Sequence, residues 1–349
     1  MTVPSPIRPG AFARVAEEFF AQVARLDEEA ALGTVRDALT AGAFPESLLM
    51  EVVAPVQERA DVLRRGGEWT VSHEHAAAYI GERAVGAVVE HVAAHGPSPA
   101  ERGKVTVACT DGDWRSLSAR VLSGVLSLRG WRVAFLGVSV PVGSLALHLQ
   151  ETGPDILALS CSMSARLVAA HAMIGAAHRI QVPVIAGGAG FGPDDFLARR
   201  LGADLWAPDA LQAADLLDAG PPYVIGREEE ALPASTAYAE VLQQREGLVH
   251  TALERAWGPG SPGSPDLQGA ELDHAVEYLG NIVDFLLAAL YVGDRQVFGR
   301  YLARTREALR ARDEPADGVL RVLDVLEEEL GEHPDALSTL GVGRDALQA

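Results

Sequence analysis

The stretch KVTVACTDGDWRSLSARVLSGVLSLRGWRVAFLGVSVP, residues 104–141, contains two apolar runs on either side of a segment with helical spacing. Two further apolar runs follow, in DILALSCSMS from Asp155 and in VPVIAGGAGFG from Val182. These runs are almost continuous instead of alternating, which is typical of parallel strands covered on both faces. The predicted strands are Val105–Thr110, Val133–Gly137, Ile156–Ser162, Val182–Gly188 and Leu205–Pro208.

Segments with helical spacing alternate with these strands, at Ser118–Leu128, Val142–Glu151, Ala165–Ile180 and Ala210–Leu217. This alternation predicts an α/β fold, a doubly wound, flavodoxin-like sheet of five parallel strands. Ligands of such sheets bind beyond the carboxyl ends of the strands. We therefore expect the functional residues in the segments Asp111–Asp113, Gly137–Pro141, Ser160–Ser164 and Gly187–Phe191.

Four short motifs follow these strands in order: Asp113-Trp-Arg115-Ser-Leu-Ser118, Gly137-Val-Ser-Val-Pro141, Ser160-Cys-Ser162 and Gly187-Gly188. Together they resemble the cobalamin-binding domain of corrinoid methyltransferases, mutases and light-responsive cobalamin-dependent repressors. That family carries Asp-x-His-x-x-Gly, Gly-x-x-x-Pro, a Ser-x-Leu or Ser-x-Thr motif, and Gly-Gly at these places. The resemblance implies a cobalamin site lined by Asp113, Arg115, Ser118, Val138, Ser160, Ser162, Gly187 and Gly188.

Two residues of the first motif depart from the family pattern. Arg115 stands where the family has the histidine that ligates cobalt from below, and a guanidinium has no lone pair to give. Ser118 replaces the glycine. The alternatives are a base-on cobalamin, another tetrapyrrole such as biliverdin or haem, or no ligand. Arg115 could instead pair with Asp113 or with an anionic group of a ligand, and the glycines could serve only as tight turns.

The region from Ala11 to about His95 is amphipathic with helical spacing, interrupted at Pro45. It resembles the helical module that precedes the corrinoid domain in methyl carriers and photoreceptor repressors. The resemblance implies that Glu74 and His75 face the upper side of the ring, with His75 as the residue able to meet the metal. Arg64 stands where that module has a capping tryptophan. Both Glu74 and His75 also suit a purely structural role at a helix start.

Composition narrows the classes of function. The 349 residues carry a formal net charge of −19, with 48% hydrophobic and 22% charged residues. An acidic surface repels phosphate backbones, so direct nucleic-acid binding is disfavoured. The opening segment has no apolar signal core, and the longest apolar run, Phe285–Val292, is too short to span a bilayer. We expect a cytoplasmic protein without membrane contact. Cys109 and Cys161 suit packing between neighbouring strands, or a redox pair.

The sequence divides into four predicted parts: a helical bundle at 1–98, the sheet domain at 99–219, a linker with one helix at 220–268, and a second bundle at 269–349. The linker contains the acidic run Gly226–Glu230 and the turn-rich segment Gly258–Pro265. The second bundle has an acidic, leucine-rich surface. This surface suits docking to a protein partner or to a second copy of the chain.

Three functions fit these features. The first is a non-enzymatic sensor that binds a corrinoid or related tetrapyrrole between bundle and sheet and signals through a transcription regulator or signalling protein. The second is a degenerate domain that binds only proteins. The third is a corrinoid methyl-carrier protein. The sequence predicts the first, as a homo-oligomer, with light, redox state or a metabolite as signal.

Overall fold

The computed structural model describes residues 11–96, 100–220, 236–257 and 269–349. It divides into two compact units. Unit 1 comprises Met1–Ser162 with Ala169–Glu228, and unit 2 comprises Met163–Val168 with Glu229–Ala349. The acidic run and the turn-rich segment predicted for the linker lie outside the described residues. The four-part division remains a prediction.

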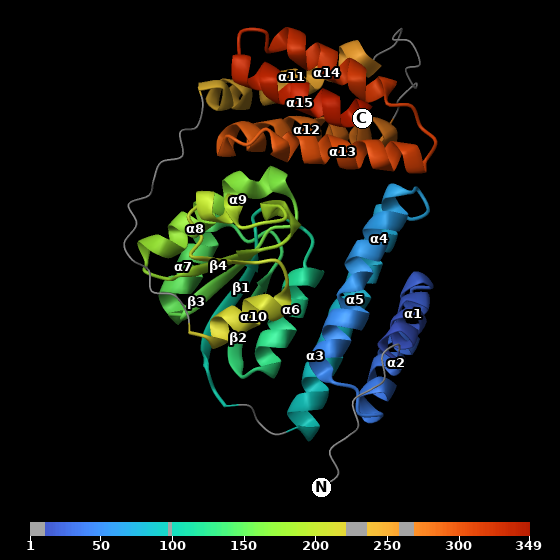
Figure 1. Ribbon diagram of the computed structural model, residues 1–349, viewed down its shortest axis with the longest axis vertical. Coiled ribbons are helices and arrows are strands. Elements are labelled where there is room, and N and C mark those ends of the chain that lie inside the picture. The colour runs from blue at the N-terminus through green and yellow to red at the C-terminus, as the bar shows by residue number, and fades with distance from the viewer. Residues whose placement is uncertain (1–10, 97–99, 221–235, 258–268) are drawn as a thin grey trace. The chain divides into compact units, whose positions relative to one another are not determined.

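Unit 1 contains one sheet of five parallel strands in the order β2-β1-β3-β4-β5 (Figure 1). This order confirms the predicted doubly wound fold. The strands are β1 Gly103–Cys109, β2 Trp131–Gly137, β3 Ile156–Ser160, β4 Val184–Gly187 and β5 Leu205–Ala207. Cys109 pairs with Ser160, and Ser160 pairs with Gly187, so three of the motif-bearing strand ends lie side by side.

The crossover helices of the sheet match the predicted segments closely. They are α6 Leu117–Leu128, α7 Val142–Thr152, α8 Leu167–Arg179 and α10 Ala210–Asp218. Short turns of 3-10 helix stand before α8 at Ser164–Arg166 and after β4 at Ala189–Phe191. One helix was not predicted, α9 at Phe196–Arg200. It has only five residues, which is too short to display helical spacing.

The N-terminal bundle consists of α1 Ala11–Ala24, α2 Glu28–Thr40, the short α3 Pro45–Ser47, α4 Pro55–Arg65 and α5 Val71–His95. Between α3 and α4, residues Leu48–Val53 form a π-helical segment, where the Ala54 N–H donates to Leu49 O at 2.8 Å. Thr70 caps α5 through the backbone N–H of His73. The predicted interruption at Pro45 is confirmed, since α2 ends at Thr40 and α3 begins at Pro45.

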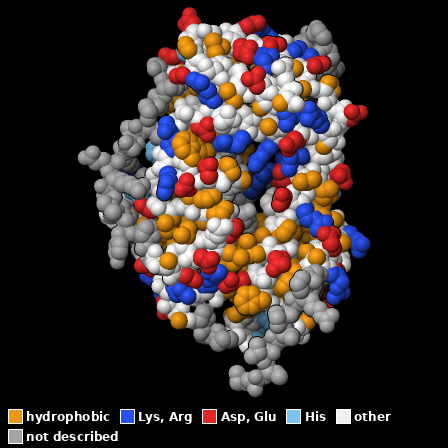
Figure 2. All heavy atoms as spheres, in the orientation of Figure 1, with side chains coloured by type: hydrophobic (Ala, Val, Ile, Leu, Met, Phe, Trp, Pro, Cys, Tyr) orange, Lys and Arg blue, Asp and Glu red, His pale blue; other side chains and the backbone are white. Residues whose placement is uncertain are grey.

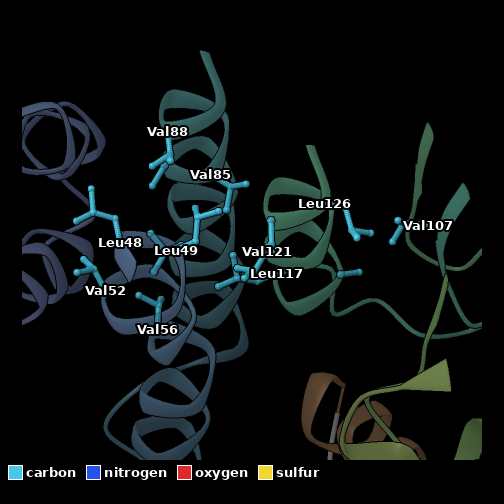
Figure 3. Close-up of a cluster of buried hydrophobic side chains, with 14 of the residues drawn as sticks. Leu48, Leu49, Val52, Val56, Val85, Val88, Val107, Leu117, Val121 and Leu126 are labelled. Carbon is cyan, nitrogen blue, oxygen red and sulfur yellow. The ribbon is translucent and has the colours of Figure 1, made fainter. Parts of the chain in front are cut away.

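One hydrophobic core runs from this bundle into the sheet (Figure 3). Leu48, Leu49, Val85 and Val88 lie on the bundle side, while Val121, Leu126 and Val107 continue the core through α6 to β1. The crossing of α5 over α6 is close because it uses glycine: a Cβ on Gly124 would lie 2.7 Å from Val85 Cγ1. The bundle and the sheet are therefore packed as one body, and we call α1–α5 the cap.

Unit 2 is helical in its described part, with α11 Thr236–Trp257, α12 Ala270–Val292, α13 Gln296–Ala311, α14 Asp317–Glu329 and α15 Pro334–Gln348. Helix α12 is long and apolar enough to cross a membrane by length and composition, but 61% of its most apolar window is buried within the protein. That burial is typical of a core helix.

Acidic and basic side chains are interspersed on the face drawn in Figure 2.

Candidate functional site

Hydrogen bonds tie together the loops that follow β1, β2 and β3. The Thr110 N–H and hydroxyl donate to Ser160 O at 2.9 and 3.0 Å. On the other side, Ser139 Oγ accepts from the Gly112 N–H at 3.0 Å and lies 3.3 Å from Asp111 Oδ1. The carboxyl ends of these strands therefore form one connected surface, at the place where the fold predicts a ligand.

Asp113 lies at the centre of this surface and is 1% exposed. Its carboxylate accepts from the Ser162 N–H at 2.5 Å, from the Ser162 hydroxyl at 2.7 Å and from the Arg115 N–H at 3.2 Å. Three donors satisfy this buried charge, as the cost of burying a carboxylate requires. Both Asp113 and Ser162 were predicted as ligand contacts, and in this structure they are hydrogen-bonded to each other.

Arg115 follows Asp113 but points its guanidinium elsewhere. Its Nη2 lies 3.2 Å from Glu74 Oε1 on α5 and 3.4 Å from Asp61 Oδ1 on α4. We call these two ion pairs the Arg115 bridge, since they join a strand-end loop to two helices of the cap. Pairing with Asp113 was one of the alternatives that the sequence left open for the Arg115 side chain, but only the backbone N–H of Arg115 reaches that carboxylate.

Glu74 is the cap's most enclosed charge, with 7% of its side chain exposed. Arg64 Nε lies 2.7 Å from its Oε2, and the Gln57 amide donates to its Oε1 at 3.2 Å. Asp61 has partners on its own helix too, with Arg65 Nε at 3.0 Å and Arg64 Nη2 at 3.4 Å. The sequence predicted Glu74 and Arg64 as site residues but missed Gln57 and Asp61. The available signal was helical spacing, because Gln57 and Asp61 lie on the same face of α4 as Arg64.

His75 is exposed, and its side chain makes no hydrogen bond or ion pair with the described residues. The exposed Tyr79 lies one turn further along α5 on the same face. Glu82, three residues beyond Tyr79, accepts a hydrogen bond from the Ser116 hydroxyl. Of the three residues His75, Tyr79 and Glu82 on this face, only Glu82 contacts the segment after β1. The role of His75 as a ligand contact therefore stays a prediction. Within the described ranges, no group of three or more His, Cys, Asp and Glu side chains could hold a metal ion.

The glycines at the strand ends have different tasks. Gly188 has φ +100°, and a Cβ there would lie 2.4 Å from Cys161 O, so the protein's own backbone requires this glycine. Gly137 has φ +85° but open space around it. Val138 is half-buried beside Gly137, and Ser118 is exposed on α6. The space next to the backbone is open at Gly137, whereas the neighbouring Val138 packs against the hydrophobic core.

Arg64 occupies the position of the tryptophan that covers the ring in the related module, so the places of the nearby Trp69 and Trp114 matter. Trp69 stacks on Phe20 with ring centroids 5.8 Å apart, so it packs inside the cap and does not cover the strand ends. Trp114, between Asp113 and Arg115, is 67% exposed. An exposed indole beside the strand ends is a flat apolar surface available to a ligand, and it was not among the residues predicted from the sequence.

Cys109 and Cys161 are buried and form no disulfide. Burial, together with the nearby negative charges of Asp113 and Glu82, raises the pKa of the Cys109 thiol to about 12. Its Sγ lies 3.7 Å from Arg115 O. A neutral, enclosed thiol fits packing. The redox pair stays an untested prediction.

Two known protein families match this chain, one over the sheet and the other over the cap. The B12 binding domain family matches residues 103–215, and a second B12 binding domain family matches residues 15–88. Residues 15–215 belong to the cobalamin-binding family with an N-terminal helical cap. Both matches support cobalamin as the ligand of this region.

The similar curated proteins are mostly corrinoid proteins. The trimethylamine corrinoid protein of Methanosarcina barkeri is 25% identical over 191 residues, which is 54% of this chain and 87% of that protein. Trimethylamine corrinoid protein 1 of Methanosarcina acetivorans is 27% identical, over 53% of this chain and 86% of its own length. The transcriptional repressor CarA of Myxococcus xanthus is 28% identical over 151 residues, but only 48% of that protein is matched.

A solved structure agrees on the fold. The monomethylamine corrinoid protein of Methanosarcina barkeri superposes with a TM-score of 0.51 at 16% identity, over 59% of this chain and 98% of that one. The predicted recognition and fold class are therefore confirmed. The relatives support the methyl-carrier interpretation better than the sensory one that the sequence favoured.

The side chains at the strand ends and on the cap determine how this chain could hold a corrinoid. Arg115 does not fit as a cobalt ligand, because a guanidinium has no lone pair to give and this one is paired with two carboxylates. The other features fit a large flat ligand: the exposed His75 and Trp114, and the open space at Gly137. A corrinoid bound here would therefore have no cobalt bond to Arg115.

Proposed function

We propose that this chain is a corrinoid carrier protein, which holds a cobalamin between the cap and the strand ends for use by a separate partner protein. The observation that carries the proposal is the extent of the match. The match to one trimethylamine corrinoid protein spans 191 residues and 87% of that protein, whereas the match to the repressor covers only 48% of the repressor. The cap and sheet shared with the carriers are also packed here around one continuous core.

In this proposal the chain binds and orients but does not catalyse. The strand-end loops would lie below the ring, and the His75–Tyr79 face of α5 would lie above it. The open space beside Gly137 would leave room for the parts of the ligand that project toward the sheet. A bound corrinoid would supply the methyl-carrying metal centre. By analogy with the names of the relatives, the methyl donor would be of the methylamine class.

The test is a spectroscopic titration of the purified full-length chain. Hydroxocobalamin should shift its absorption bands on binding and stay with the protein through gel filtration, at about one equivalent per chain. Haem and biliverdin serve as comparison ligands, because the sequence left them open. A protein that retains no cobalamin, or that retains haem or biliverdin in its place, would remove the carrier proposal.

A regulatory function is the second candidate, favoured by the 28% identity to a repressor. It predicts that light changes the assembly of the adenosylcobalamin-loaded protein. The carrier function predicts an unchanged oligomeric state in light and dark. It also predicts that the methylcobalamin-loaded protein passes its methyl group to a thiol when an acceptor methyltransferase is added. Size-exclusion chromatography in the dark and after illumination separates the two.

A further inference from the structure

The Arg115 bridge crosses the space that the proposed function gives to the ligand. Its two ends lie on different parts of unit 1, with Arg115 on the loop after β1 and Glu74 on the first turn of α5. A flat ring between them needs a nonbonded contact of about 3.5 Å on each face, hence a separation of roughly 7 Å. Arg115 Nη2 and Glu74 Oε1 are 3.2 Å apart. The ring and the bridge cannot occupy this place together.

We propose that the Arg115 bridge holds the cap closed over the strand ends in the ligand-free protein, so that corrinoid binding has to break it. This inference rests on the proposed function for the identity of the ligand. In this proposal Arg115 lowers the affinity for the corrinoid, because its ion pairs compete with the ligand. A ligating histidine at the same position would raise that affinity.

The charges in the cap allow the bridge to open without leaving a buried carboxylate unpaired. Glu74 keeps the ion pair with Arg64 at 2.7 Å and the hydrogen bond from Gln57 at 3.2 Å. Asp61 keeps Arg65 at 3.0 Å. Removing the only partner of a buried charge would cost several kcal/mol. Here each carboxylate has a second cationic partner inside the cap, so the bridge is a reversible contact.

The rest of the contact between cap and sheet is of a different kind. Below the bridge, Leu117 of α6 packs so closely on α5 that a Cβ on Gly81 would lie 2.9 Å from it. At the other end of α6, Arg129 Nε lies 3.0 Å from Glu46 Oε1 on α3, and Arg129 also pairs with Asp215 and Asp218. Apolar packing and the Arg129 pairs fix the base of the cap, whereas ion pairs close it at the strand ends.

Two variants separate these contacts. Arg115→Met removes the charge and keeps most of the side-chain length, and Arg129→Met removes the ion pairs at the base. Asp61→Asn weakens the bridge from the cap side and serves if Arg115→Met does not fold. Hydrogen exchange of the ligand-free proteins is the first measurement. We expect peptides from residues 55–80 to exchange faster in the Arg115→Met variant and at the wild-type rate in the Arg129→Met variant.

Hydroxocobalamin titration is the second measurement. We expect Arg115→Met to bind about tenfold more tightly than wild type, which corresponds to about 1.4 kcal/mol. Arg129→Met should bind like wild type.

The outcomes separate this inference from the proposed function. Unchanged exchange in both Arg115→Met and Asp61→Asn would overturn the bridge proposal, whatever binds. Faster exchange with no cobalamin retained by any variant would support the bridge and remove the proposed function. Weaker cobalamin binding by Arg115→Met would show that Arg115 holds the ligand and does not compete with it, which also overturns the proposal.

Discussion

At the scale of single residues, Cys109 illustrates how burial sets chemistry at the end of β1. Its side chain is fully enclosed, and its thiol has a pKa of about 12 because burial disfavours the thiolate. The thiolate is the reactive form of cysteine. The environment of Cys109 thus protects a thiol that lies directly beneath the candidate site.

We predict that Cys109 reacts with the disulfide reagent DTNB roughly a thousandfold more slowly in the folded protein than in urea, because its pKa is raised by about three units. Both cysteines of the chain should react at once after unfolding. The measurement is the absorbance of the released thiolate at pH 8. Rapid reaction of two thiols in the native protein would show that the strand ends are open to solvent.

Gly188 is the second residue whose role can be tested alone. We predict that Gly188→Ala lowers the free energy of unfolding by about 3 kcal/mol or more, since it combines a glycine-only backbone conformation with a contact of 2.4 Å to Cys161 O. Gly137→Ala is the matched control, because it has positive φ but free space, and should cost about 1 kcal/mol. Urea unfolding measures both, and equal losses would contradict the clash.

For Arg115, the sequence predicted the position of the residue in the site but not the partners of its side chain. The motif placed it correctly in the loop after β1, and chemistry excluded it as a cobalt ligand. Its partners Asp61 and Glu74 lie 54 and 41 residues earlier in the chain. Such distant pairing depends on the packing of the cap, which no local pattern expresses, so the alternatives that the sequence offered for Arg115 did not include these two partners.

At the scale of elements, the crossing of α5 and α6 joins the cap to the sheet. Gly124 lies where a Cβ would be 2.7 Å from Val85 Cγ1 and 3.0 Å from Leu49 Cδ1. A branched valine held in a core has little freedom to move aside. The glycine is therefore a condition of this close contact between helices.

We predict that Gly124→Ala destabilises unit 1 by about 1–3 kcal/mol, although alanine favours helices, because overpacking outweighs the gain in propensity. Gly33→Ala in the middle of α2 is the control, since a Cβ at Gly33 would have no atom within 4 Å. It should stabilise by about 0.5–1 kcal/mol. Thermal unfolding followed by circular dichroism compares the two, and a stabilised Gly124→Ala would contradict the packing.

Elements with a clear apolar pattern in the sequence were predictable, and elements without such a pattern were not. The nearly continuous apolar runs indicated all five strands of the sheet, and the usual strand order of the predicted flavodoxin-like fold agrees with the observed one. The π-helical segment Leu48–Val53 changes the period of the chain, and the five-residue α9 is too short to show one. Trp114 was missed as a candidate because an exposed aromatic in a loop has no periodic signal.

At the scale of the whole molecule, the second unit carries its own titratable core. Tyr278 and Tyr301 are enclosed among α12 and α13, where Tyr301 stacks on Phe285 with centroids 3.9 Å apart. Burial raises the pKa of Tyr278 to about 12, and it raises that of Tyr301 further. A hydrogen bond with Thr305 opposes the shift in both.

The sign of this shift predicts how unit 2 responds to alkali. The folded phenol of Tyr278 stays neutral while the unfolded one ionises near pH 10, so its contribution to stability is complete below pH 10 and is lost between about pH 10 and pH 12. Tyr278→Phe should reduce this loss. Urea unfolding of unit 2 across that pH range is the measurement, and stability independent of pH would contradict the burial of the phenol.

The central claim concerns the whole of unit 1, in which the cap and the strand ends enclose a cobalamin. Anomalous X-ray scattering at the cobalt edge, from crystals grown with hydroxocobalamin, tests it most directly. The account predicts one cobalt peak between the first turns of α5 and the carboxyl ends of β1 and β3, with Arg115 moved away from Glu74. Bound cobalt at any other place, or an intact Arg115 bridge beside the bound ring, would contradict it.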